Sequence, residues 1–219
     1  MMRPLYFLIA ICGLLALLLS VASAQPVAPE TPDAVIAKML ERNPSLNSFT
    51  ARVHVDMRML NFPFLSPVLD GTSYYKRPNS YEVVFDRVPG YAKGFEKLFD
   101  DVGDPISWQR DQNLTLEAGK QLYGRPVIAL YMTKKIHSTI LDHTIAYIDP
   151  DTYELLQMEW HYTSGGTIVM RQWYRREGGY SVLSQQHVEI DIPHVRAVGD
   201  STFGPYQTNV AIDTSVFTK

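Results

Sequence analysis

Histidine side chains are the first candidates in this chain for metal binding or proton transfer. None of the six stands in a His-x-x-x-His or His-Glu-x-x-His spacing, which would place two ligands on one face of a helix. Strand alternation points His54 outward, and solvated strand positions explain His161 and His187 equally well. A zinc site assembled across strands is the alternative, but no spacing supports it, and we predict no metal site. The six are His54, His137, His143, His161, His187 and His194.

Paired carboxylates could perform general acid–base catalysis, and three pairs occur. Two of them fall in expected loops or turns. Glu189 and Asp191 share one face of an expected strand, so acid–base chemistry is conceivable there. A solvated polar face explains this pair more simply. The three pairs are Asp100 with Asp101, Asp149 with Asp151, and Glu189 with Asp191.

Motifs for covalent catalysis or phosphate binding are missing from the sequence. Ser164-Gly165-Gly166 lacks the Gly-x-Ser-x-Gly pattern of a nucleophile elbow and falls where a hairpin turn is expected. The glycines at 178 and 179 serve a second turn in the same way. We therefore predict that the chain is not an enzyme. A hydrolase that uses Glu189, Asp191 or a histidine is the weakest of the alternatives.

The N-terminus has the pattern of a secretory signal peptide. Arg3 supplies the positive start, an apolar run covers Leu5–Leu19, and Ala22-Ser23-Ala24 precedes Gln25 as a small-residue cleavage site. The run is short for a membrane span. We reject lipidation at Cys12, because Ile11 occupies the position where a small residue is needed. Residues 1–24 are thus expected to be removed, and the protein to be exported to the periplasm.

The composition of the mature chain excludes several classes of protein. Without Arg3 it has 19 basic and 23 acidic residues, a net charge of about −4, and nucleic-acid binding calls for a basic face. The single cysteine leaves with the signal peptide, so no disulfide is available, which suits a bacterial periplasm at least as well as a eukaryotic secretory route. We expect a flexible leader at residues 25–30 and a single domain at residues 31–219.

The spacing of apolar residues changes from helical to strand-like early in the mature chain. Thr31 and Pro32 begin a helix whose apolar residues share one face, and Asn43-Pro44 ends it. From Phe49 to Met59 apolar and polar residues alternate strictly, which predicts a strand with one buried face. A hairpin is expected next, with strands at 69–76 and 81–87.

The rest of the chain predicts mainly strands. Residues 91–100 indicate a short amphipathic helix, 105–110 a strand, and 112–124 a stretch without a clear pattern. Turn signals about ten residues apart then divide the C-terminal half into an antiparallel meander with strands at 126–134, 142–149, 153–163, 167–177, 180–192 and 205–212. The fold class is α+β: a strongly curved antiparallel sheet, or incomplete β-barrel, with helices against its concave side.

Methionine and aromatic residues are concentrated in the expected strands. Unbranched methionine is not a preferred strand residue, but its flexible, polarisable side chain suits a wall that adapts to variable ligands. An ordinary core of Met and Tyr explains the composition at least as well. The strand methionines are Met57, Met59, Met132, Met158 and Met170.

The expected curvature favours a cavity, because a concave apolar face is too large for its own side chains to fill. Helices or a ligand must then cover it. We expect the glycine-hinged helix at 91–100 to be a lid, with Tyr91, Phe95, Leu98 and Phe99 on its inner face. The expected lining residues are Val55, Met57, Met59, Tyr75, Phe85, Trp108, Met132, Met158 and Trp160.

Several stretches, taken in order, resemble the periplasmic lipoprotein carriers and outer-membrane lipoprotein-sorting proteins of the LolA/LolB-like superfamily. Together they extend over most of residues 31–219. They are Leu46-Asn47-Ser48-Phe49-Thr50-Ala51, Gly71-Thr72-Ser73-Tyr74-Tyr75-Lys76-Arg77-Pro78-Asn79, Gly124-Arg125-Pro126-Val127-Ile128-Ala129-Leu130, Ala146-Tyr147-Ile148-Asp149-Pro150-Asp151-Thr152, and the closing Tyr206, Asn209, Ile212-Asp213 and Phe217.

This resemblance implies an unclosed barrel with a helical lid over an apolar cavity, no catalysis and no cofactor. We expect an exported, monomeric protein that holds a lipid or lipoprotein acyl chain, for transport or for envelope sensing. Envelope membrane proteins are the expected partners, and nucleic acid is not. The opposing hypothesis is a structural or protein-interaction module of the envelope whose apolar face is a filled core or an interface.

Overall fold

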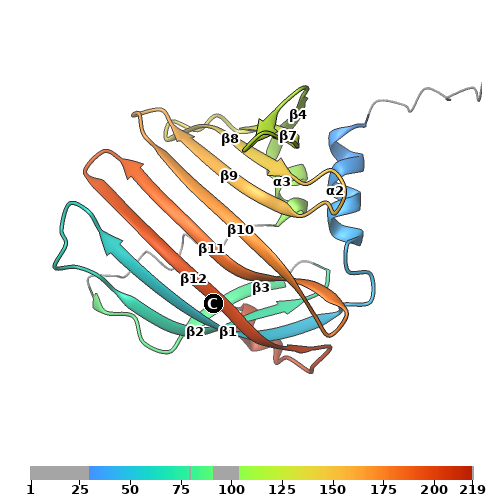
Figure 1. Ribbon diagram of the computed structural model, residues 1–219, viewed down its shortest axis with the longest axis vertical. Helices are drawn as coiled ribbons and strands as arrows, with labels where there is room; N and C mark the ends of the chain where they lie inside the picture. Colours follow the sequence, from blue (N-terminus) through green and yellow to red (C-terminus); the bar gives the residue numbers. More distant parts are fainter. Residues whose placement is uncertain (1–29, 79, 91–103, 219) are drawn as a thin grey trace, which may run out of the picture. The chain divides into compact units, whose positions relative to one another are not determined.

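One curved antiparallel sheet dominates the structure (Figure 1), a computed structural model that describes residues 30–78, 80–90 and 104–218. Its ten strands follow the order β3-β2-β1-β12-β11-β10-β9-β8-β7-β4, and the sheet does not close on itself. They are β1 (Ser48–Met59), β2 (Val68–Lys76), β3 (Ser80–Phe85), β4 (Gln112–Glu117), β7 (Ile128–Lys134), β8 (Leu141–Ile148), β9 (Leu155–Tyr162), β10 (Thr167–Glu177), β11 (Tyr180–Ile192) and β12 (Val195–Thr208).

The smaller elements are two helices, a short hairpin and a terminal turn. The helices α2 (Pro32–Glu41) and α3 (Pro105–Asp111) pack on the concave face of the sheet, and η3 (Thr214–Phe217) follows β12 and contacts β3. A separate two-stranded hairpin consists of β5 (Gln121–Leu122) and β6 (Arg125–Pro126). Neither described helix is long and apolar enough to cross a bilayer. The predicted α+β incomplete barrel is confirmed.

Strand β1 lies inside the sheet because both of its edges are paired. It pairs antiparallel with β2 on one side and with β12, the last strand of the chain, on the other. Its burial follows the sequence alternation: Val53, Val55 and Met57 are buried, whereas Arg52 and His54 are exposed. The alternation therefore correctly predicts the strand and its inner face.

The two helices begin at residues that cap them. The Thr31 hydroxyl accepts a hydrogen bond from the Ala34 amide at 3.2 Å, and Pro32 follows at the first helical position. Asp104 caps α3 in the same manner, accepting from the Ile106 amide at 3.0 Å. The predicted strand at 105–110 is therefore wrong, because the Asp-Pro start signal of a helix outweighs the short apolar run.

Two further strand predictions need correction. The last strand, expected at 205–212, begins at Val195 and ends at Thr208, because Asn209 turns the chain with φ at 54°. The stretch at 112–124 contains β4 and β5, and β4 pairs with β7 throughout its length. The expected helix at 91–100 lies outside the described residues.

Two hydrophobic clusters cover the concave face. One lies between β1, β2, β3 and the β10–β12 strands, and includes Val55, Met57 and Phe203. The other lies under α2 and α3, where Val35, Ile36 and Trp108 pack on β7–β10. Trp160 and Val188 are partly buried and pack against both clusters, which makes the apolar face continuous across the sheet.

Candidate ligand-binding cavity

A cavity of about 230 Å³ lies at the end of the sheet where α2 finishes. The antiparallel strands bring the starts of β1, β9 and β11 to this end, together with the ends of β2, β10 and β12. We call it the end cavity. Its base is apolar, because Leu155, Val182 and Phe203 line it and are at most 4% exposed. Leu40 and Pro78, which are exposed, lie at its mouth.

The end cavity lies where the two hydrophobic clusters meet. Leu155 and Met39 belong to the cluster under the helices or pack against it. Phe203, Tyr81 and Tyr206 belong to the other cluster or pack against that one. A ligand in the end cavity would therefore contact residues of both hydrophobic clusters on the concave face.

Polar groups in and beside the wall of the end cavity are hydrogen bonded to one another. The Tyr174 hydroxyl donates to Gln172 Oε1 at 2.7 Å, and Gln172 Nε2 donates to Gln186 Oε1 at 3.1 Å. Both glutamines are buried on the concave face, where an unpaired amide would be costly. This chain of bonds restrains the Tyr174 hydroxyl and satisfies the Gln172 side-chain amide.

Burial raises the pKa of two tyrosines that line the end cavity, Tyr81 and Tyr206. Burial raises the pKa of Tyr81 to about 12, and a contact with the Ser73 hydroxyl offsets part of that rise. Burial also raises the pKa of Tyr206, whose hydroxyl donates to the Leu183 carbonyl at 2.7 Å. The wall thus presents phenol groups with no negative charge at neutral pH.

Two arginines stand at the mouth, positioned around Asn43. Arg77 donates to the Asn43 carbonyl at 2.8 Å, and the guanidinium carbon of Arg42 lies 4.6 Å from the centre of the Tyr174 ring. The Asn43 side chain is itself held by the backbone of Ser181 on β11, with bonds of 2.8 and 3.1 Å. These contacts tie the end of α2 and the β2–β3 turn to the sheet.

Of the nine residues predicted to line a cavity, Tyr75 lines the end cavity. The other eight lie on or against the two clusters. Met57, Met132 and Trp108 are at most 1% exposed, and Phe85 and Trp160 are partly buried. Val55, Met59 and Met158 are also buried. Contact between any of the nine residues and a ligand stays a prediction. The predicted lid residues Tyr91, Phe95, Leu98 and Phe99 lie outside the described residues.

The predicted methionines form a row across the concave face. Met57 on β1 lies opposite Gly199, which lies opposite Val188, and Met170 and Met158 continue the row on β10 and β9. Methionine has no branch at Cβ and adapts its shape at low cost. The face next to the end cavity can therefore rearrange more easily than one built from branched side chains.

Sequence reasoning missed most of the end cavity. Leu46, Phe49 and Phe203 line it but were not predicted, and neither were the two arginines. Phe49 begins the alternating strand, and its ring stacks on Tyr75 with centroids 5.2 Å apart. That cross-strand pairing depends on the register of β1 with β2, which alternation alone does not supply.

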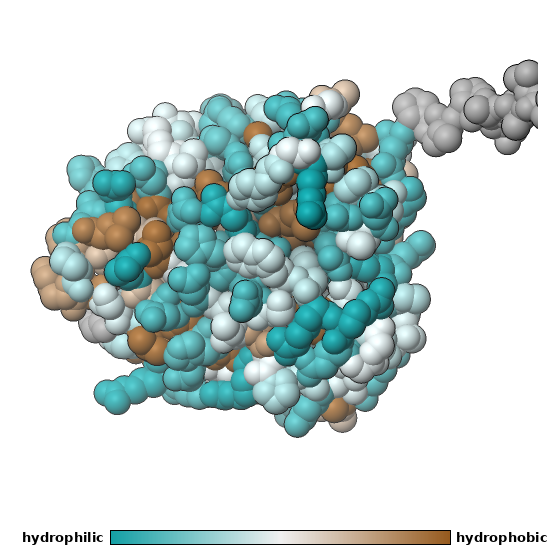
Figure 2. Space-filling view, in the orientation of Figure 1, coloured by the Kyte–Doolittle hydropathy of each residue, from teal (hydrophilic) through white to brown (hydrophobic). Residues whose placement is uncertain are grey.

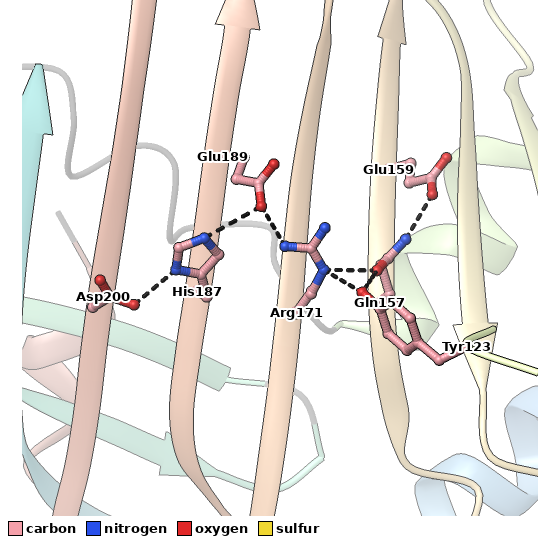
Figure 3. Close-up of polar contacts among 7 residues, drawn as sticks. All are labelled: Tyr123, Gln157, Glu159, Arg171, His187, Glu189 and Asp200. Carbon is pink, nitrogen blue, oxygen red and sulfur yellow. Dashed lines mark hydrogen bonds and ion pairs between the residues drawn. The ribbon is translucent and has the colours of Figure 1, made fainter. Parts of the chain in front are cut away.

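The outer face of the sheet carries a polar row instead (Figure 3). Asp200 contacts His187 at 2.7 Å, His187 lies 3.4 Å from Glu189, and Glu189 pairs with Arg171 at 2.5 Å. Arg171 also donates to the Tyr123 hydroxyl, which reaches over from the turn between β5 and β6. Figure 2 views the molecule from this side and shows mainly hydrophilic residues with smaller hydrophobic patches between them.

The row holds the carboxylates that could have been catalytic. Both Glu189 and Asp191 lie on the exposed outer face, paired with Arg171 and Arg196 respectively. The Arg171 guanidinium holds the pKa of Glu189 below its usual range, which suits an ion pair better than a proton donor. Among the described residues, no three His, Cys, Asp or Glu side chains are placed to hold a metal ion.

Comparison with known proteins identifies the fold. No protein-family model matches the chain, and no curated protein matches its sequence. A DUF1329 family protein from Desulfovibrio piger superposes with a TM-score of 0.67 at 11% identity, over 85% of this chain and 95% of that one. A LolA superfamily protein from Nitrosomonas europaea gives 0.65 at 11% identity, over 87% and 98%.

A third solved structure agrees with these two. A domain assigned to the outer membrane lipoprotein-sorting proteins, from Vibrio parahaemolyticus, superposes with a TM-score of 0.62 at 8% identity, over 84% of this chain and 94% of that one. The chain therefore has the LolA-like fold, which confirms the predicted resemblance at the level of the fold.

Proposed function

We propose that this protein, built on the LolA-like fold, binds an acyl chain of a lipid or lipoprotein in the end cavity. The observation that carries the proposal is the position of that cavity: its base opens onto both hydrophobic clusters of the concave face. Each methylene moved from water into such a site contributes about 0.8 kcal/mol.

The size of the end cavity indicates how a longer chain would enter. A volume of about 230 Å³ falls below the roughly 300–1,000 Å³ of ordinary small-molecule sites. A longer acyl chain would therefore displace neighbouring side chains of the concave face. Met158 and Met170 are suited to this role, because the thioether side chain changes rotamer without strain from branching.

A binding role without catalysis fits the described residues better than an enzyme. On the outer face Glu189 pairs with Arg171 and Asp200 with His187, and the end cavity is lined by arginines, amides, tyrosines and one carboxylate, Asp104, which caps α3. An exported protein of this kind would work in the periplasm, and its partners would be a lipid or lipoprotein and proteins of the envelope membranes. Transport and envelope sensing are both compatible with such binding.

Two measurements test this proposal. Native mass spectrometry with lipid extraction, on protein purified from its own host, should detect a bound lipid, and a fluorescent fatty-acid probe should bind the delipidated protein. Val182→Trp, which fills the base of the end cavity, should abolish probe binding. Val169→Trp is the matched control, because Val169 lies on the outer face of β10.

The proposal fails if the protein carries no lipid and also ignores the probe. It fails equally if Val182→Trp and Val169→Trp bind the probe alike while both remain folded by circular dichroism. Val182 is buried, so Val182→Trp could disrupt folding, and a smaller change at a second position tests the same proposal. Tyr75→Ala should weaken probe binding with little loss of stability, because Tyr75 is only partly buried.

A second candidate function is protein interaction through the loop between β1 and β2. This loop exposes Leu60, Phe62 and Phe64, with Phe64 80% exposed, and Val68 at the start of β2 is exposed beside it. Apolar side chains gathered on one loop are typical of an interaction surface. Crosslinking in cells, with a photoreactive residue at position 64, tests this function separately from lipid binding. A crosslinked envelope protein that disappears with Phe62→Ser supports it.

A further inference from the structure

The mouth of the end cavity carries two positively charged side chains. Arg42 and Arg77 both line the cavity, and neither is paired with a carboxylate among the residues that the structure describes. Five other arginines of the chain do form such pairs, namely Arg52, Arg110, Arg171, Arg175 and Arg196. Arg58, Arg87, Arg125 and Arg176 also lack a carboxylate partner among the described residues, so what distinguishes Arg42 and Arg77 is that they line the cavity.

Arg42 is also short of a hydrogen-bond partner. Its Nε is buried and makes no hydrogen bond within the described structure, although a guanidinium has five donors to satisfy. The guanidinium is held against the Tyr174 ring rather than against an acid. A buried donor without an acceptor is costly, so a ligand that supplies one is favoured.

The two guanidinium groups are positioned before any ligand arrives. Arg42 precedes Asn43 in the chain, Arg77 donates to the Asn43 carbonyl at 2.8 Å, and Ser181 fixes the Asn43 side chain to β11. Arg42 is further restrained by its contact with Tyr174. Long side chains fixed in this way lose less freedom on binding.

Nearby carboxylates are engaged elsewhere. Asp104 lines the end cavity, but its side chain accepts from the Ile106 amide at 3.0 Å and caps α3. Glu154 is not among the lining residues, and it accepts a hydrogen bond from the hydroxyl of Ser181 in the wall. The lining side chains therefore carry two positive charges and one negative charge, with the negative one committed to a helix terminus.

We propose that the end cavity selects an anionic amphiphile, whose carboxylate or phosphate head is held by Arg42 and Arg77 while its acyl chain enters between Leu155 and Phe203. The selection rests on the proposed function, since it assigns a head group to the same bound chain. Guanidinium groups match both kinds of head, because two parallel N–H donors meet two oxygens. A neutral acyl chain would leave the Arg42 Nε unpaired.

Three ligands that share a ten-carbon chain distinguish the contribution of the head group to affinity from that of the hydrocarbon chain. They are decanoate, decyl phosphate and decanol. We expect isothermal titration calorimetry to show that at least one anion binds about tenfold more tightly than decanol, a difference of about 1.4 kcal/mol. Preference for decyl phosphate alone indicates a phospholipid-like head, and preference for both anions admits a free fatty acid. Decanol binding by itself tests the proposed function.

Variants of the two arginines then test whether Arg42 and Arg77 cause the preference for an anionic ligand over decanol. Arg42→Gln and Arg77→Gln should reduce it to about twofold or less, while decanol affinity stays unchanged and reports an intact cavity. Arg52→Gln is the matched control: it removes the same charge from the outer face, where Arg52 pairs with Asp86, and should preserve the preference.

If a variant misfolds and loses decanol binding, the salt dependence of the wild-type protein still tests the proposal. Its preference for the anion should shrink as sodium chloride rises from about 0.05 to 0.5 M, because added salt screens the attraction. Equal affinities for decanol and both anions, or a preference that survives both arginine changes and high salt, would overturn the proposal while leaving acyl-chain binding intact. Failure of all three ligands to bind would overturn the proposed function as well.

Discussion

Gly199 lies directly opposite Met57 where β12 pairs with β1. A Cβ atom at position 199 would come within 3.3 Å of Met57 Cγ and within 3.0 Å of Val188 Cγ1. The missing side chain therefore gives Met57 its place on the concave face, where it is fully buried. Gly199 therefore leaves the room that the Met57 side chain occupies on the concave face.

Gly199→Val should lower the free energy of unfolding by about 1–3 kcal/mol, because it overpacks the space that Met57 occupies. Urea denaturation measures the loss. Met57→Ala should cost about 2–5 kcal/mol by leaving a cavity, and the double variant should lose less than the sum of the two. Gly90→Ala is the control, since nothing lies within 4 Å of a Cβ there. Additive losses in the double variant would contradict this account of the pair.

Alkaline pH should destabilise the protein through Tyr81. Its pKa is about 10 in the unfolded chain and about 12 in the folded protein. A pKa raised by folding gives stability that is complete below pH 10 and is lost as the pH rises towards 12. Tyr81→Phe should flatten the dependence of unfolding free energy on pH in this window. Denaturation curves at several alkaline pH values check it, and identical slopes for the two proteins would refute the assignment.

The Arg171–Glu189 pair should contribute little to stability and should depend on salt. The Glu189 side chain is 47% exposed, and exposed pairs contribute about 0.2–1 kcal/mol. A double-mutant cycle with Arg171→Ala and Glu189→Gln measures the coupling, which should fall when the ionic strength is raised. Because Arg171 lowers the pKa of Glu189, the coupling is present above the unfolded pKa and is lost as acid protonates Glu189. A coupling that persists unchanged at pH 2 would count against the ion pair.

Asn209 should stabilise the end of β12 in two separable ways. Its φ of 54° favours Asn or Gly, and its side chain accepts from the Asn47 amide at 2.8 Å and donates to the Tyr180 hydroxyl at 3.0 Å. Asn209→Gly should lose the side-chain bonds at about 0.5–1.5 kcal/mol. Asn209→Ala should lose about 1–2 kcal/mol more, because an L-residue is strained there. Thermal unfolding of the three proteins tests the ranking; equal losses would exclude backbone strain.

Local features of the fold could be predicted because they depend on neighbouring residues. The alternation from Phe49 to Met59 identified β1 and its buried face, and glycine pairs located the turns before β10 and between β10 and β11. Helix α3 was predicted wrongly as a strand for the opposite reason. Its seven residues are too few to show a helical period. The cap at Asp104 and the packing of Trp108 determine that this segment is a helix.

The candidate site could be predicted only in part, because its parts come from distant segments. The sequence supports an apolar concave face, and the predicted Tyr75 does line the end cavity. It does not indicate that Arg42 and Arg77 meet at Asn43, since 34 residues separate the two segments that bond there.

The sequence by itself determined which residues alternate, where turns form and that one sheet face is apolar, since these follow from side-chain chemistry within a few residues. The tertiary structure decided where the apolar face remains unfilled and which charges stand beside that space. Both depend on the register of β1 with β2 and β12 and on the docking of α2. If one strand shifted its register by one residue, each of its side chains would move to the opposite face of the sheet. No local sequence pattern specifies which strands pair with each other.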